Sequence, residues 1–199
     1  MQEFGAQVLD LGCAQASRFD DQFGATAPQV SINVSPQQLE DDHFVDQLEA
    51  TLRRFDLGAS ALCLEITESR PIVDAVGVDE NLERVRTLGV SVAIDDFGSG
   101  YSSLRQLRRL RADILKLDGE LTDGLGQDRD SNLIVGAAVG LGRALGMQTI
   151  AERVEHPWQI EALTTLGCSA IQGYVISPPI NQTAITELIR RGPLLPQRT

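Results

Sequence analysis

The chain is organised around the stretch Val92-Ala93-Ile94-Asp95-Asp96-Phe97-Gly98-Ser99-Gly100-Tyr101-Ser102-Ser103-Leu104. The stretch begins as a short apolar strand, continues with two adjacent carboxylates and a loop with two glycines, and ends where a helix would start. Adjacent aspartates repel each other, so a protein that holds both at a strand end usually has a cation there. The alternative is a solvated turn with a helix cap, because Asp, Gly and Ser are common turn residues. Matching polar groups on other strands would favour the cation.

Length and composition predict one soluble globular domain. The 199 residues are enough to bury a substantial core, and 42% hydrophobic with 23% charged residues is an ordinary globular composition. The formal charge of −11 disfavours non-specific binding to DNA, RNA or an anionic membrane, because phosphate groups would be repelled. It still allows a phosphate substrate that arrives together with a divalent metal ion.

The cysteines and the apolar segments predict a cytoplasmic protein. Cys13, Cys63 and Cys168 are far apart and surrounded by apolar residues, which indicates buried thiols in a reducing compartment rather than disulfides or a zinc site. The first residues show no signal peptide. The most apolar segment, residues 133–145, is too short to span a bilayer and contains three glycines, so no membrane contact is expected.

Short apolar runs alternate with segments of helical periodicity, an order that favours parallel strand–helix units. Six strands are expected, over residues 29–35, 61–67, 90–94, 112–117, 147–151 and 170–176. Helices are expected over 4–19, 131–145 and 183–190 and between the other strands, with Asp41 or Asp42 capping the helix after the first strand.

This order predicts an α/β fold, an incomplete TIM-type (β/α) barrel with about six of the eight strands present. The domain would cover residues 1–190, and a polar tail would follow at 191–199. A doubly wound sheet is the alternative fold. It would normally carry a glycine-rich phosphate loop after an early strand, and none follows the first two strands expected here.

Alternation within the expected strands predicts which polar side chains face the barrel axis. If the large apolar residues face the surrounding helices, then Asn33, Glu65 and Asp95 face inward. Barrel enzymes place their chemistry near the C-terminal ends of the strands. Further polar residues fall at such ends: Lys116, Asp118, Glu152 and Gln172.

Converging oxygen ligands would suit a hard cation, Mg²⁺ or Mn²⁺. The oxygens would come from Asn33, Glu65, Asp95, Asp96 and Glu152. A salt-bridge network around Lys116 is the alternative. One lysine cannot neutralise that many acids, so we favour metal binding.

Other candidate sites are weaker. Ser102 or Ser103 as a nucleophile would need a base nearby, but His43 and His156 are expected at helix starts, away from the strand ends. A different metal-dependent barrel enzyme, with Lys116 as its base, stays open as an alternative.

Six motifs follow one another along the chain: Asn33-Val34-Ser35-Pro36, Leu64-Glu65-Ile66-Thr67-Glu68-Ser69, the stretch from Asp95 to Leu104, Lys116-Leu117-Asp118, Ala151-Glu152-Arg153-Val154-Glu155 and Gln172-Gly173-Tyr174. In sequence and order they resemble the motifs of EAL domains, which are bacterial cyclic-di-GMP phosphodiesterases with a TIM-type barrel. The resemblance covers about residues 3–190. It implies a part in bacterial second-messenger signalling, through hydrolysis of one phosphodiester bond of cyclic-di-GMP to give linear pGpG.

The resemblance also implies roles for these residues. Asn33, Glu65 and Asp95 would bind a first Mg²⁺ or Mn²⁺ ion. Asp95, Asp96 and Glu152 would serve a second ion and the attacking water.

Further roles follow from the same resemblance. Lys116 and Gln172 would lie beside the reacting phosphate and water, and Glu68 would hold the loop over residues 96–103. The implied partners are cyclic-di-GMP and, as is common in the family, a second copy in a homodimer, with no DNA or RNA polymer. The substrate would be contacted by Asp118, Ser99, Gly100 and Tyr174.

The chain also departs from the family. The Glu-Ala-Leu motif and its strand are expected upstream of Met1, and that Glu is a metal ligand in the family, so impaired metal binding and activity are expected. Two missing strands would leave the strands of Asn33 and Gln172 as edges. Arg153 stands where glycine is usual and is expected to point away from Glu152. The alternative function is an inactive module that binds cyclic-di-GMP or a protein partner.

Overall fold

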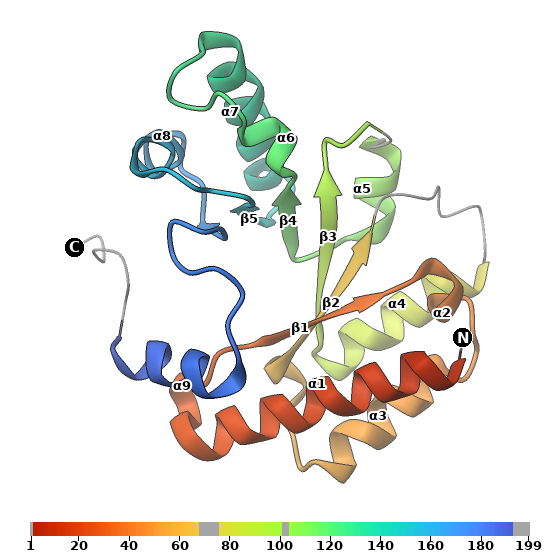
Figure 1. Cartoon of the computed structure of the whole chain (residues 1–199). Coiled ribbons are helices and arrows are strands. Elements are labelled where there is room, and N and C mark those ends of the chain that lie inside the picture. The colour runs from red at the N-terminus through yellow and green to blue at the C-terminus, as the bar shows by residue number, and fades with distance from the viewer. Residues whose placement is uncertain (1, 68–75, 101–103, 193–199) are drawn as a thin grey trace.

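The computed structural model describes residues 2–67, 76–100 and 104–192 and shows an open parallel sheet with helices packed against it (Figure 1). The six strands follow one another across the sheet in chain order, and each neighbouring pair is parallel. They are β1 Val30–Val34, β2 Leu62–Thr67, β3 Ser91–Phe97, β4 Ile114–Leu117, β5 Gln148–Ala151 and β6 Ala170–Ile171. In the described chain β1 and β6 are edges and the barrel is not closed, which confirms the predicted fold class.

The helices connect the strands and cover the sheet. α1 lies beside β1 and β2, α4 beside β3, and α7 beside β4 and β5 (Figure 1). None of the helices in the described ranges is long and apolar enough to cross a membrane. The helices are α1 Gln2–Phe23, α2 Pro36–Leu39, α3 Phe44–Arg54, α4 Val76–Leu88, α5 Leu104–Leu110, α6 Gly119–Thr122, α7 Arg129–Ala144, α8 Pro157–Leu166 and α9 Gln182–Arg190.

The hydrophobic core lies between the helices and one face of the sheet. Ile32 and Val34 of β1 are buried in this core, whereas Asn33 between them is exposed. The large side chains of β2, such as Leu64, are buried in the same core. The alternation predicted from the sequence is therefore confirmed, with large residues toward the helices and polar residues toward the opposite face.

β3 is longer than predicted. It runs through Phe97, so Asp95 and Asp96 lie within the strand rather than after it. The ladder of β3 with β4 continues as far as the pair of Phe97 with Leu117, which carries both aspartates inside the sheet.

β6 is shorter than the expected range 170–176, because beyond Ile171 the chain pairs with the loop that follows β5. The N–H of Val154 donates to the carbonyl of Gln172, and the N–H of Val175 donates to the carbonyl of Val154, each over 3.0 Å. A Cβ at Gly173 would lie 2.1 Å from that Val154 carbonyl oxygen. Glycine is required for this close approach.

The start of α3 differs from the prediction that Asp41 or Asp42 caps it. His43 occupies the N-cap position and makes no capping hydrogen bond with its side chain. Asp41 instead accepts a hydrogen bond from the N–H of His43 over 2.9 Å, which closes a turn just before the helix.

The three cysteines are free thiols, and two of them are buried as predicted. Burial raises the pKa of Cys13 and of Cys63 to about 11. Cys168 is only half-buried, which differs from the prediction that all three thiols are buried.

Candidate metal centre

Strand register brings the predicted polar residues to one face of the sheet. Asn33 of β1 is in register with Glu65 of β2. Glu65 is in turn in register with Ala93 of β3, which lies two residues before Asp95 on the same strand. Residues in register, and residues two apart on one strand, point to the same face. The same register continues through β4 and β5 to Lys116 and Glu152.

Lys116 is the only lysine of the chain, and 4% of it is exposed. Its Nζ lies 3.0 Å from Glu65 Oε2, 2.8 Å from Asp95 Oδ1 and 2.7 Å from Glu152 Oε1. Burial alone would lower the pKa of this ammonium group, but the three carboxylates raise the pKa above its usual value. Lys116 is therefore a fixed positive charge, which argues against a role as a base.

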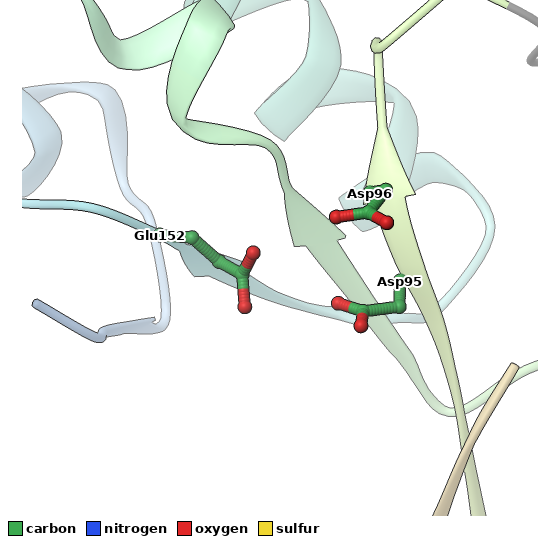
Figure 2. A group of neighbouring side chains, drawn as sticks. All are labelled: Asp95, Asp96 and Glu152. Atoms are coloured by element: carbon green, nitrogen blue, oxygen red, sulfur yellow. The ribbon is translucent and has the colours of Figure 1, made fainter. Parts of the chain in front are cut away.

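Asp96 joins this group because β3 contains a bulge. The register with β4 shifts between Ile94 and Phe97, and Asp96 has a left-handed φ of 57°. In a regular strand Asp95 and Asp96 would point to opposite faces, but the bulge turns both toward one side. Figure 2 shows the two carboxylates from β3 facing Glu152, which follows β5. Carboxylate oxygens of Asp95, Asp96 and Glu152 lie within 4.8 Å of one another, and these three residues are called the acidic cluster below.

Mutual repulsion in the acidic cluster favours a bound cation. Burial raises the pKa of Glu152, and the charges of Asp95 and Asp96 raise it further against the opposing effect of Lys116. The pKa of Asp96 is also raised, first by burial and then by Asp95 and Asp118. A shared positive ion would lower both pKa values.

One oxygen of the cluster lacks a hydrogen-bond donor. Asp95 Oδ1 is buried and forms an ion pair with Lys116, but this contact does not have hydrogen-bond geometry and no other described residue donates to it. Buried polar atoms are normally satisfied. A divalent cation held by the carboxylates of Asp95, Asp96 and Glu152 would satisfy this oxygen, so the residues present fit a metal ion.

Five further residues that the sequence predicted for the site lie outside the contacts of Lys116 and the acidic cluster. These five are exposed, and their side chains make no hydrogen bond or ion pair within the described chain. Glu68 lies outside the described residues, so the structure says nothing of its predicted role. The exposed residues are Asn33 on β1, Ser99 and Gly100 after β3, and Gln172 and Tyr174 after β6.

Asp118 is held by two neighbours. Its carboxylate accepts a hydrogen bond from the N–H of Glu120 over 2.7 Å, which caps α6, and Nη2 of Arg153 lies 3.0 Å from each of its oxygens. Burial would raise the pKa of Asp118, but these hydrogen bonds and the Arg153 charge lower the pKa below its ordinary value. Arg153 has a left-handed φ of 50°, which the strand alternation could not reveal. The glycine that is usual at this position in EAL domains indicates such a backbone, because glycine adopts positive φ values without strain.

The chain belongs to the EAL domain family, whose sequence profile matches residues 1–179. It is 40% identical over 178 residues to the bifunctional diguanylate cyclase/cyclic di-GMP phosphodiesterase MucR of Pseudomonas aeruginosa, covering 89% of this chain and 26% of that protein. It is 36% identical over 162 residues to the cyclic di-GMP phosphodiesterase NbdA of the same organism, covering 81% of this chain and 21% of that protein. The chain thus spans about a quarter of the length of these curated relatives.

Solved EAL structures share the fold. The EAL domain of Mycobacterium smegmatis DcpA superposes with a TM-score of 0.91 at 36% identity, covering 98% of this chain and 87% of that one. The PaMucR phosphodiesterase in complex with c-di-GMP superposes with a TM-score of 0.83 at 39% identity, covering 92% of this chain and 74% of that one.

Proposed function

We propose that this chain is the catalytic part of a bacterial signalling phosphodiesterase that hydrolyses cyclic-di-GMP to linear pGpG. The observation that carries the proposal is the acidic cluster, in which oxygens of Asp95, Asp96 and Glu152 lie within 4.8 Å of one another beside a buried lysine. Membership of the EAL family supports it, since the relatives MucR and NbdA are named as cyclic di-GMP phosphodiesterases.

Two divalent ions, Mg²⁺ or Mn²⁺, would complete this site. We assign the first to Asn33, Glu65 and Asp95, and the second to Asp95, Asp96 and Glu152. Ions bound there would activate water and neutralise charge on the phosphodiester.

The chain's own residues would orient the reactants. Lys116 holds Glu65, Asp95 and Glu152 in place through its three ion pairs and directs a fixed positive charge toward the reacting phosphate. We assign Gln172 to the orientation of water and phosphate, and Glu68 to support of the loop after β3. Substrate contacts are assigned to Asp118, Ser99, Gly100 and Tyr174.

A binding-only module is the second candidate. The exposed side chain of Asn33, which is in register with the buried Glu65, favours it. A metal ligand that is open to solvent would lower the affinity of the first site for its ion, and it would lower the affinity for the dinucleotide less.

The test is incubation of cyclic-di-GMP with the protein and Mn²⁺, followed by chromatography of the nucleotides. We expect pGpG to appear, at a rate that depends on Mn²⁺. Calorimetric binding of cyclic-di-GMP without any pGpG would leave the binding-only module. Neither binding nor pGpG would contradict both candidates.

We also propose a cytoplasmic location, which the three free cysteines support because such thiols persist in a reducing compartment. A homodimer stays a prediction, and sedimentation velocity of the purified protein would test it.

A further inference from the structure

We propose that Arg153 is a substrate-binding residue, whose guanidinium group holds a phosphate oxygen of the dinucleotide at the rim of the acidic cluster. This rests on the proposed function, because it assigns a contact to the same substrate. Arg153 directly follows Glu152 of the cluster in sequence.

The backbone at Arg153 is shaped to place this side chain. Its φ of 50° is left-handed, a conformation that costs conformational energy in any residue with a Cβ. Because the chain turns in this way directly after Glu152, the Arg153 side chain extends to Asp118 and Gly119, which follow β4.

The contacts with Gly119 and Asp118 fix the guanidinium group. A Cβ at Gly119 would lie 2.1 Å from Arg153 Nε and 2.6 Å from its Cδ, so the arginine stem packs on bare glycine backbone. Nη2 lies 3.0 Å from both carboxylate oxygens of Asp118. A guanidinium group held from two sides loses less conformational entropy when it binds a ligand.

Donors of Arg153 remain for a ligand. An arginine carries five N–H donors, and the hydrogen bonds to Asp118 use Nη2 alone. The side chain is 60% exposed, and no described residue accepts a hydrogen bond from its Nη1. Planar guanidinium groups of this kind bind phosphate oxygens through paired hydrogen bonds.

The charges around the site favour a phosphate contact by Arg153. A phosphodiester that approaches the acidic cluster meets several carboxylates, and the positive charge of Lys116 is already shared among three of them. Arg153 directly follows Glu152 of the cluster, and its partner Asp118 lies two residues after Lys116. Its exposed guanidinium group therefore offers a phosphate a second positive charge, outside the buried ion pairs of Lys116.

The test compares Arg153→Gly with the matched control Arg111→Gly. Arg111 is also exposed and has a left-handed φ of 43°. It precedes β4, whereas Asp118, the partner of Arg153, follows β4, so Arg111 lies at the end of the strand away from the acidic cluster. Glycine suits both backbones and each change removes one positive charge, so both variants should fold. We expect Arg153→Gly to weaken calorimetric binding of cyclic-di-GMP about tenfold or more, and Arg111→Gly to change it less than about twofold.

Kinetics separate a substrate contact from a structural ion pair. A substrate contact raises KM for Arg153→Gly about tenfold, while kcat changes less than about threefold. Because Asp118 is itself assigned to the substrate, the comparison is repeated in an Asp118→Ala background. Arg153→Gly should still raise the Kd and KM there, and the absence of any further effect in that background would overturn the inference. Should Arg153→Gly fail to unfold cooperatively, Arg153→Gln and Arg111→Gln provide the same comparison, because glutamine keeps an apolar stem over Gly119.

Two outcomes distinguish this inference from the proposed function. If the unchanged protein binds cyclic-di-GMP and Arg153→Gly binds it equally well, the inference is overturned while the proposed function stands. If the unchanged protein does not bind cyclic-di-GMP, the proposed function fails, and the inference fails with it because its ligand is lost.

Discussion

The Nζ atom of Lys116 lies 2.7 Å from Oε1 of Glu152, so the only lysine of the chain joins β4 to the residue that follows β5. The same Nζ contacts Glu65 on β2 and Asp95 on β3. One ammonium group thus holds four neighbouring strands together at the site, in a region where the carboxylates alone would repel one another.

Replacing Lys116 with methionine should destabilise the protein strongly in the absence of metal. Methionine preserves much of the side-chain volume but leaves buried carboxylates without their counter-charge, which costs about 3–5 kcal/mol. Urea unfolding in EDTA at pH 7 would measure this loss. The exposed pair of Arg53 and Glu49 provides the control, since Arg53→Ala should cost less than about 1 kcal/mol. Equal effects of the two changes would contradict a central role for Lys116.

Asp96→Asn should stabilise the metal-free protein at neutral pH. The folded-state pKa of Asp96 is raised above its ordinary value of 3.8, so the folded protein binds more protons than the unfolded chain just above that pH. The stability linked to this proton is present below pH 3.8 and is lost as pH rises through the folded-state pKa. Asparagine keeps the left-handed backbone and removes the charge.

Urea unfolding in EDTA at pH 7 and near pH 3.5 would measure this effect, with Asp46→Asn on the exposed face of α3 as the control. Asp96→Asn should gain stability at pH 7 and gain little at the lower pH. In Mn²⁺ the order should reverse, because the unchanged protein gains about 2.7 kcal/mol at a hundredfold excess over Kd and the variant does not. A variant that is less stable at pH 7 in EDTA would refute the repulsion at this position.

Lys116 should resist amine-directed acylation in the native protein. It is buried and its pKa is raised, so an unprotonated amine is rarely available. Because the chain has no other lysine, mass spectrometry should find only the N-terminal amine modified at pH 8, and Lys116 modified after denaturation in urea. Rapid acylation of Lys116 in the folded protein would contradict the closed ion-pair network.

The two buried cysteines should react more slowly with alkylating reagents than the half-buried Cys168. Burial raises the pKa of Cys13 and Cys63 to about 11, so about a thousandth of each is thiolate at pH 8. Iodoacetamide should therefore label the half-buried Cys168 first. Peptide mapping would show the order, and equal labelling of Cys13 would disagree with the packing of α1 on β1.

The fold and most of the site could be predicted from the sequence because strand alternation is a local property. The parity that separated Ile32 and Val34 from Asn33 also placed Glu65 and Asp95 on the inner face, and the structure confirms that face. Lys116 and Glu152 followed from the same periodicity, and Lys116 contacts Glu152 directly.

The features that strand periodicity alone does not explain depend on departures from regular strands. Strand parity would place Asp96 opposite Asp95, and only the bulge in β3 brings them together. The left-handed backbone of Arg153 has no signature in the arginine itself. The early end of β6 results from pairing with Val154, a contact between segments that sequence periodicity does not connect.

Hydrolysis of cyclic-di-GMP by the protein and its Asp95→Asn variant, followed as pGpG formation in Mn²⁺, is the direct test of metal-dependent catalysis at the acidic cluster. Asparagine keeps the size of the side chain but removes the negative charge of Asp95, which we propose as a ligand of both metal ions. We expect pGpG from the unchanged protein and from Asp46→Asn, and at least about a hundredfold less from Asp95→Asn. Asp95→Asn as active as the unchanged protein, or no pGpG from any of the three, would contradict metal-dependent catalysis at this cluster.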